Sequence, residues 1–348
     1  YNYVRNQNGI YTICTGTLDK GGIDHSASAF RDIQIDTDNN VSTSLRYAFV
    51  APQATIVSPM KRQKAATTPQ GELSISVNAY HSQAKTTQVS YTLSLAENNC
   101  PIAQGTLTPH SDWNWGTNIT LPAWRQGKEL ELSITACFND GKQATDSGRF
   151  FYEGNFQTSV SPDEAWNTLL QNATHTGGIN RSDIRLPLQL AWTANTGSNI
   201  FMTSPLIADD KVFVATTDDN ISMNTHLCAF DIRTGKLLWK YRTENSIKNT
   251  IAYEEGILVA QDAACHLYAV DAATGKLLWK HEMNPHGYPY LTEGLTVSDG
   301  TVYAGIGASL SAYNLKTGSI LWINKDWRQR EGSTTTLTVA GDLSLIHI

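Results

Sequence analysis

The sequence has few charged residues and no long apolar run. Asp, Glu, Lys and Arg make up 17% of its 348 residues, and the formal net charge at pH 7 is −6. A negative chain has no electrostatic attraction to nucleic acid or to an anionic membrane surface, so neither is expected as a partner. No run approaches the roughly 18 apolar residues that a membrane helix requires, so no membrane span is expected.

Cysteine is also scarce, and its spacing excludes a common metal site. The five cysteines are Cys14, Cys100, Cys137, Cys228 and Cys265, with no Cys-x-x-Cys pattern and no cluster of His and Cys. A zinc site is therefore not expected. Cys100 and Cys137 lie in one predicted domain and could pair, with free buried thiols as the alternative. The cysteine count leaves the redox compartment open.

The sequence lacks an initiator Met and a signal sequence. It begins at Tyr1 within a strand-like pattern, and it ends in what we interpret as the first hairpin of a further repeat. We expect the chain to be a fragment of a longer protein, and the missing targeting segment then carries no information about location.

What the sequence does contain is a repeat. Residues 226–240 (HLCAFDIRTGKLLWK), 266–280 (HLYAVDAATGKLLWK) and 309–323 (SLSAYNLKTGSILWI) are three copies of one pattern. Their tryptophans are 40 and 43 residues apart. A period of roughly 40–45 residues is typical of four-stranded propeller blades, so the repeat predicts a β-propeller.

Each copy has the pattern of two strands around a tight turn. The Asp or Asn accepts backbone N–H groups, the Thr adds a hydroxyl cap, and the Gly supplies a positive φ. The Trp is expected to lay its flat face on the neighbouring blade and to donate its N–H to a carbonyl. A structural role is therefore predicted for Asp231, Gly235, Trp239, Asp271, Gly275, Trp279, Gly318 and Trp322.

A weaker hairpin precedes each copy. Its turns are Asp209-Asp210, Glu255-Gly256 and Asp299-Gly300, each between two apolar runs. Two hairpins make one four-stranded blade, so the sequence predicts three blades and part of a fourth.

Residues 267–279, Leu-Tyr-Ala-Val-Asp-Ala-Ala-Thr-Gly-Lys-Leu-Leu-Trp, resemble the repeat of the PQQ-like (quinoprotein-type) β-propellers. The resemblance covers about residues 160–348. In the dehydrogenases of that family it implies a quinone on a Trp, a calcium held by Glu, Asn and Asp, and often two adjacent cysteines. This sequence has no adjacent cysteines and no such acidic group. PQQ is therefore not expected as a cofactor, and a quinoprotein dehydrogenase is an alternative hypothesis.

Two strand patterns near the start carry a second resemblance. Residues 9–16 (GIYTICTG) and 30–36 (FRDIQID) resemble the C-terminal strands of calcineurin-like metallophosphoesterases. This implies that residues 1–50 are the remnant of such a domain, whose catalytic motifs and divalent metals lie upstream. Asp24 and His25 suit a metal by chemistry, but no further ligands stand nearby, so a solvated loop is expected. No catalytic, cofactor-binding or metal-binding residue is predicted in this chain.

The next hundred residues carry short strands at even spacing. Examples are residues 73–80, 88–95, 129–136 and 148–152, separated by turn clusters. About seven strands in about 100 residues predict an immunoglobulin-like β-sandwich. Nearby loops contain Trp113, Trp115 and Trp124, for which packing or contact with a neighbouring domain is expected and stacking on sugar rings is the alternative.

A linker with a short helix is predicted between sandwich and propeller. Ser161-Pro-Asp-Glu164 is a helix start signal. Trp166, Leu169 and Leu170 would form one apolar helical face. His175 is expected to be a hydrogen-bonded structural residue and not a ligand.

The loops that follow each Trp strand emerge on one face of a propeller, where they can present aromatic and basic side chains. Such side chains suit a small polar molecule, a glycan or a protein, with ordinary inter-blade loops as the alternative. The candidate ligand-binding residues are Lys248, His286, Tyr288, Tyr290, Trp327, Arg328 and Arg330.

The predicted organisation is all-β in four parts. Residues 1–50 are the metallophosphoesterase-like remnant, 51–153 the sandwich, 154–190 the linker and 191–348 the truncated propeller. The resemblances imply an exported protein, periplasmic or extracellular, in which the propeller is a binding or scaffolding module attached to a metal-dependent phosphoesterase. A scaffold for outer-membrane protein assembly is a further alternative.

Overall fold

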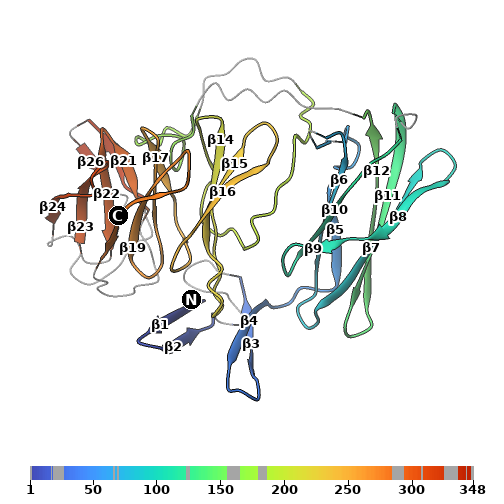
Figure 1. The fold of residues 1–348 in the computed structure, drawn as a ribbon, viewed down its shortest axis with the longest axis horizontal. Coiled ribbons are helices and arrows are strands. Elements are labelled where there is room, and N and C mark those ends of the chain that lie inside the picture. The colour runs from blue at the N-terminus through green and yellow to red at the C-terminus, as the bar shows by residue number, and fades with distance from the viewer. Residues whose placement is uncertain are drawn as a thin grey trace.

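The computed structural model describes residues 2–16, 18, 27–65, 67–68, 70–122, 126–154, 165–178, 186–283, 294–306, 309–324, 336–341 and 343–345. Every regular element in these ranges is a β-strand, and none of them forms a helix that could span a membrane. The all-β prediction is confirmed. Figure 1 shows the blades at one end, a two-sheet sandwich at the other, and the N-terminal hairpins below and between them.

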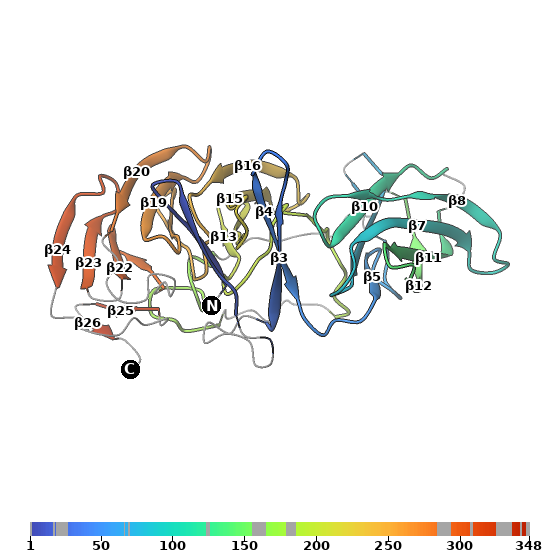
Figure 2. The same cartoon turned by 90° about the horizontal axis from the view of Figure 1, so that it is seen from below.

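Two separate antiparallel hairpins begin the chain. The strands are β1 (Tyr3–Gln7), β2 (Ile10–Cys14), β3 (Ala29–Ile35) and β4 (Val41–Tyr47). β1 pairs with β2 and β3 pairs with β4, so each makes a two-stranded sheet. Both views place the β1–β2 hairpin across one face of the first blades, and β3–β4 between the blades and the sandwich (Figures 1 and 2).

Two four-stranded sheets form the sandwich. Their orders are β5-β6-β10-β9 and β12-β11-β7-β8. The strands are β5 (Gln53–Ser58), β6 (Leu73–Tyr80), β7 (Thr86–Leu95), β8 (Pro101–Thr106), β9 (Thr108–Pro109), β10 (Asn114–Ile119), β11 (Lys128–Phe138) and β12 (Gln143–Tyr152). Alternate residues such as Leu73, Ile75 and Val77 of β6 are buried in one core between the sheets.

Three further four-stranded sheets are the blades, each in simple chain order. Blade 1 is β13 (Leu206–Ala208), β14 (Lys211–Ala215), β15 (His226–Asp231) and β16 (Leu237–Arg242). Blade 2 is β17 (Ala252–Glu254), β18 (Ile257–Gln261), β19 (His266–Asp271) and β20 (Leu277–Glu282). Blade 3 is β21 (Thr296–Ser298), β22 (Thr301–Ile306), β23 (Ser309–Asn314) and β24 (Ile320–Asn324), and a hairpin of β25 (Thr338–Ala340) and β26 (Leu343–Leu345) follows.

The blades share apolar cores because both faces of their inner strands are apolar. All five residues of β18 and the first five of β19 are buried. Phe213 of blade 1 stacks on Tyr253 of blade 2, with 5.8 Å between ring centroids. The inner strands of one blade are therefore buried against those of its neighbour.

The predicted turns are present. In the first hairpin of each blade, Asp209-Asp210, Glu255-Gly256 and Asp299-Gly300 have positive φ at both residues, as a type I′ turn requires. In the second, the Asp271 carboxylate accepts the Thr274 N–H and hydroxyl, each at 2.7 Å. Gly275 follows with a φ of 72°.

Each of three tryptophans covers a turn glycine of the next copy of the repeat. The indole N–H of Trp192 donates to the Ile232 carbonyl at 2.8 Å. The indole N–H of Trp239 donates to the Ala272 carbonyl at 3.1 Å, and that of Trp279 donates to the Leu315 carbonyl at 2.7 Å. A Cβ on Gly235, Gly275 or Gly318 would lie 2.5–2.7 Å from the ring above it. The predicted contact of the Trp face with the neighbouring blade and of its N–H with a carbonyl is thus observed.

Trp322 is the exception among the repeat tryptophans. It is 43% exposed and lies beside Tyr303, with 6.2 Å between ring centroids. No turn in the described part of the chain covers it.

The apolar helical face predicted in the linker is wrong. The start signal at residues 161–164 lies outside the described residues, and Trp166 forms a β-bridge with Ile207 at the edge of blade 1. The neighbouring residues are turn and bridge, because backbone pairing with a blade and burial of the Trp166 ring against its core outweigh local helix signals. His175 bonds to the Thr338 hydroxyl at 2.9 Å, and burial lowers the pKa of its ring.

Cys100 and Cys137 do not form a disulfide, and none of the five cysteines belongs to one. Cys137 lies opposite Gln88 on β7, whereas Pro101, next to Cys100, lies opposite Ser94. Six residues of strand separate these positions, which is about 20 Å. This distance is far beyond the reach of a disulfide.

Substitution of Gly275 tests the contact between blades. Gly275→Ala places a methyl group against Trp239 and imposes strain at positive φ. The control Gly256→Ala has the same strain in the same blade, with no atom within 4 Å of the new Cβ. In both variants the strain lowers the free energy of unfolding by about 1–2 kcal/mol. We expect overpacking to lower it by roughly a further 1–3 kcal/mol in Gly275→Ala alone. If urea unfolding gives the same free energy of unfolding for both variants, the contact between Gly275 and Trp239 is contradicted.

Candidate functional site

The predicted ligand-binding loops are described only in part. Residues His286, Tyr288, Tyr290, Trp327, Arg328 and Arg330 lie outside the described residues, as do Asp24, His25 and Trp124. Lys248, in the loop after blade 1, is the one candidate that can be placed.

Lys248 is buried and paired. Its ammonium lies 2.8 Å from the Asp219 carboxylate, and it also donates to the backbone carbonyl of Asn2. The two side chains are 6% and 14% exposed. Burial raises the pKa of Asp219, although Lys248 and the Ser246 hydroxyl favour its charged form. Lys248 thus holds the N-terminal strand on the blade and does not offer its charge to a ligand in solvent.

Arg31 of β3 makes a second attachment to blade 1. Its guanidinium donates to the Asp219 carbonyl at 2.6 Å and to the Asn220 side chain at 3.2 Å. The same Asn220 oxygen accepts the N–H of Leu45 at 2.8 Å, so both strands of the hairpin are held. Arg31 also donates to Thr15, which joins the two N-terminal hairpins.

Strand β4 of this hairpin is hydrogen-bonded to the sandwich. Arg46 of β4 is buried and donates to the carbonyls of His81, Ser82 and Ala84. Tyr47 donates its N–H to the hydroxyl of Tyr80 at 2.7 Å. The β3–β4 hairpin therefore connects sandwich and propeller.

Two of the loop tryptophans have packing roles. Trp113 stacks on Tyr80 with 4.3 Å between ring centroids and lies beside Tyr47 at 5.2 Å. Trp115 is buried in the sandwich core. The described tryptophans of this region thus make the packing contacts expected from the sequence.

A polar network lies in blade 2 and includes Glu244 of the loop that leads into this blade. The fully buried Asp262 carboxylate accepts the hydroxyl of Tyr268 at 2.7 Å and contacts Nδ1 of His266 at 3.0 Å. His266 Nε2 lies 3.3 Å from Glu244, which also pairs with Lys280. Burial acts to lower the pKa of His266, but the hydrogen bond and charge of Asp262 outweigh it and the pKa is raised.

This network lacks a nucleophile. Cys265 is adjacent, but burial and the Asp262 charge raise the pKa of its thiol to about 12, which keeps it protonated at neutral pH. No group of three or more His, Cys, Asp or Glu side chains suited to a metal occurs in the described ranges. The network therefore joins blade 2 to the loop that carries Glu244.

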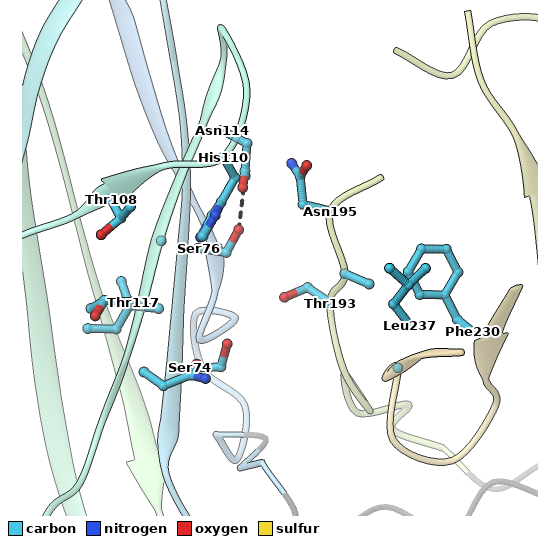
Figure 3. Close-up of a pocket in the computed structure, with 15 residues that line it drawn as sticks. Ser74, Ser76, Thr108, His110, Asn114, Thr117, Thr193, Asn195, Phe230 and Leu237 are labelled. Carbon is cyan, nitrogen blue, oxygen red and sulfur yellow. Dashed lines mark hydrogen bonds between the residues drawn. The ribbon is translucent and has the colours of Figure 1, made fainter. Parts of the chain in front are cut away.

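A hollow lies between the sandwich and blade 1. Its volume is about 660 Å³ (Figure 3). One wall is the outer surface of β6 and β10, and the other is the segment around Thr193 and Asn195 with Phe230 and Leu237. We call this hollow the interdomain cleft.

The wall on the sandwich carries neutral polar side chains. Strand register places Ser74 opposite Asn118, Ser76 opposite Gly116, and Asn78 opposite Asn114. Asn114 donates to the Ser76 hydroxyl at 3.0 Å. Sequence alternation marks Ser74 and Ser76 as outward-facing, but only the pairing of β6 with β10 and the place of blade 1 assemble the wall. Sequence reasoning missed this site for that reason.

Comparison with known families gives one match. Residues 187–345 match the family model PQQ_2, described as outer membrane protein assembly factor BamB. The match covers less than half of the 348 residues and lies on the three blades. It supports the PQQ-like β-propeller that the repeat predicts. The sequence has no match among curated proteins.

Solved structures show weaker likeness. The quinohemoprotein alcohol dehydrogenase from Comamonas testosteroni has 22% identity and a TM-score of 0.41, over 47% of this chain and 27% of that one. A europium-containing methanol dehydrogenase has 21% identity and a TM-score of 0.37, over 47% and 32%. The fibronectin(III)-like modules of Clostridium thermocellum CbhA have 17% identity and a TM-score of 0.20, over 29% and 97%. This chain thus spans a third or less of the two dehydrogenases.

The two equivalent histidines of blades 1 and 2 predict opposite pH dependences. The raised pKa of His266 stabilises the fold fully below its ordinary value of 6.5, and this contribution is lost as pH rises through the raised value. Burial and the charges of Lys240 and Arg242 lower the pKa of His226, so its protonation destabilises the fold below pH 6.5.

The measurement is urea unfolding across pH for wild type, His266→Gln and His226→Gln. The free energy of unfolding of wild type minus that of His266→Gln should fall as pH rises above 6.5. The free energy of unfolding of wild type minus that of His226→Gln should fall as pH drops below 6.5. If both of these differences change with pH in the same direction, the assigned environments are contradicted.

Proposed function

We propose that this chain is a binding and scaffolding module of an exported multidomain protein, in which the propeller holds the N-terminal segment in a fixed place. The supporting observation is the β3–β4 hairpin, which Arg31 attaches to blade 1 and Arg46 attaches to the sandwich. Charged groups are costly to bury unless each finds a partner. Here Arg31 donates to the Asp219 carbonyl and the Asn220 side chain of blade 1. Arg46 donates to three backbone carbonyls of the sandwich, and together these bonds favour one relative orientation of the parts.

The finer proposal concerns the domain to which the N-terminal strands belong. The resemblance of residues 9–16 and 30–36 to the last strands of calcineurin-like metallophosphoesterases supports a metal-dependent phosphoesterase whose catalytic residues lie upstream. An immunoglobulin-like type for the sandwich and a periplasmic or extracellular location belong to the same proposal. The parent protein would be a hydrolase, with the propeller as its accessory module.

A quinoprotein dehydrogenase is the less supported alternative. The residues in the described ranges do not fit a quinone, because Trp192, Trp239 and Trp279 are already used to cover turns of the next repeat. No acidic group suited to a calcium ion accompanies them there.

A scaffold for outer-membrane protein assembly is a second candidate. The observation in its favour is the family match, whose description names that role for the matched proteins. The match leaves out the sandwich and the N-terminal hairpins, which such a role does not explain.

Phosphoesterase activity is tested on the protein encoded by the reading frame extended upstream of Tyr1. Hydrolysis of bis(p-nitrophenyl) phosphate with Mn²⁺ should be measured with and without EDTA. Chelator-sensitive hydrolysis together with upstream Asp and His motifs is expected. If both are missing, the phosphoesterase proposal is wrong, and binding to outer-membrane assembly components becomes the next measurement.

Substitution of Arg31 tests the scaffold itself. Arg31→Met removes charged hydrogen bonds worth about 2 kcal/mol or more, so amide exchange in Ala29–Ile35 should rise roughly 30-fold. The control Arg149→Met breaks an ion pair with Glu131 in which the Arg149 side chain is 54% exposed, and it should leave this segment unchanged. Equal exchange in wild type and Arg31→Met would overturn the role of the hairpin.

A further inference from the structure

We propose that the interdomain cleft is a binding site for a neutral oligosaccharide. The inference rests on the cleft and is independent of the phosphoesterase proposal. Its volume of about 660 Å³ lies within the roughly 300–1,000 Å³ typical of small-molecule sites.

The sandwich wall is built of groups that both donate and accept hydrogen bonds. Ser74, Ser76 and Thr108 carry hydroxyls, and Asn114 and Asn118 carry amides. Ser76 accepts from Asn114, which leaves the Ser76 hydroxyl proton free to be donated into the cleft. Sugar hydroxyls have the same dual character, so such a wall matches them in either orientation.

Among the residues that the structure describes, no Asp, Glu, Lys or Arg lines the cleft. A phosphate, a carboxylate or a cationic ligand would enter this site without an opposite charge to offset its lost hydration. The adjoining hollow carries Asp112 and Asp218, whose charges disfavour anionic ligands further. The lining therefore favours an uncharged polar ligand.

The floor of the cleft is shaped by a glycine. A Cβ on Gly116 would lie 2.8 Å from the Ile75 carbonyl and 3.0 Å from Nε2 of His110. The absence of a side chain lets the His110 ring lie close over the strand, where it lines the cleft. The imidazole adds a further hydrogen-bonding group to this wall.

The opposite wall adds apolar surface beside polar groups. Phe230 and Leu237 of blade 1 line it, and Thr193 and Asn195 stand next to them (Figure 3). A ligand between the walls would thus meet hydrogen-bonding groups on one side and a mixed surface on the other. This combination is typical of sites that orient a polar organic ligand.

The cleft is held open by contacts between the domains. Besides the β3–β4 hairpin, Gln63 accepts the N–H of Leu190 at 2.8 Å, and Gln189 accepts the N–H of Lys64 at 3.0 Å. These bonds join the sandwich to the segment that leads into blade 1. A site formed before the ligand arrives loses less conformational entropy on binding.

The test is calorimetric titration of the whole chain with named trisaccharides. The neutral probes are maltotriose, cellotriose, mannotriose and N,N′,N″-triacetylchitotriose, and trigalacturonate is the charged comparison. We expect at least one neutral probe to bind and trigalacturonate to bind at least tenfold more weakly. No binding by any neutral probe, or equal binding of trigalacturonate, would overturn the proposal.

Matched variants locate the site. Ser76→Trp should fill the cleft and abolish binding, whereas Ser133→Trp, at an exposed position of β11 in the opposite sheet, should bind as wild type does. Asn118 is exposed, so Asn118→Ala tests the wall without a bulky insertion, and its expected loss of affinity is roughly two- to tenfold. Thermal unfolding of each variant controls for folding. Undiminished binding by folded Ser76→Trp would place the ligand elsewhere and refute the cleft site.

Discussion

The contact of a tryptophan ring with a glycine turn of the next repeat is the interaction on which the propeller depends. The ring of Trp239 lies on Gly275 and its N–H bonds to the Ala272 carbonyl, and Trp279 repeats this on Gly318. An indole buries a large apolar area and satisfies its one polar group in the same contact. This contact joins the outermost strand of one blade to a turn of the next, while the shared cores join the inner strands.

The β3–β4 hairpin has the corresponding role between domains. Its Arg31 binds blade 1 and its Arg46 binds the sandwich. The Asn220 side-chain oxygen of blade 1 accepts hydrogen bonds from both strands of the hairpin. Because a buried guanidinium tolerates few alternative partners, the hairpin favours a single arrangement. The interdomain cleft is a consequence of this arrangement, since its two walls belong to parts that share no sheet.

Local chemistry accounts for what could be predicted. The turns at Asp209-Asp210 and Asp271–Gly275, and the strands on either side, follow from residues a few positions apart, and they are present. The predicted helical face that includes Trp166 is absent although its apolar spacing suits a helix, because the backbone of Trp166 pairs with that of Ile207, 41 residues away. Lys248 was predicted in a ligand-binding loop, yet the Asn2 carbonyl and Asp219 enclose it. Neither partner is visible in the pattern around Lys248.

The sequence by itself determined the all-β class, the repeat and the turns that its Asp and Gly residues form, because these depend on short-range geometry that recurs from copy to copy. The contacts of Trp239 and Trp279 could be predicted as well, because each joins one copy of the repeat to the next. The tertiary structure alone decided which charged groups are buried and where a ligand has room. Those outcomes depend on segments far apart in the chain, such as Arg31 with Asp219 or Ser76 with Phe230 across the cleft. Periodicity carries no information about such pairs, since each occurs once and its energy depends on the exclusion of water by both partners.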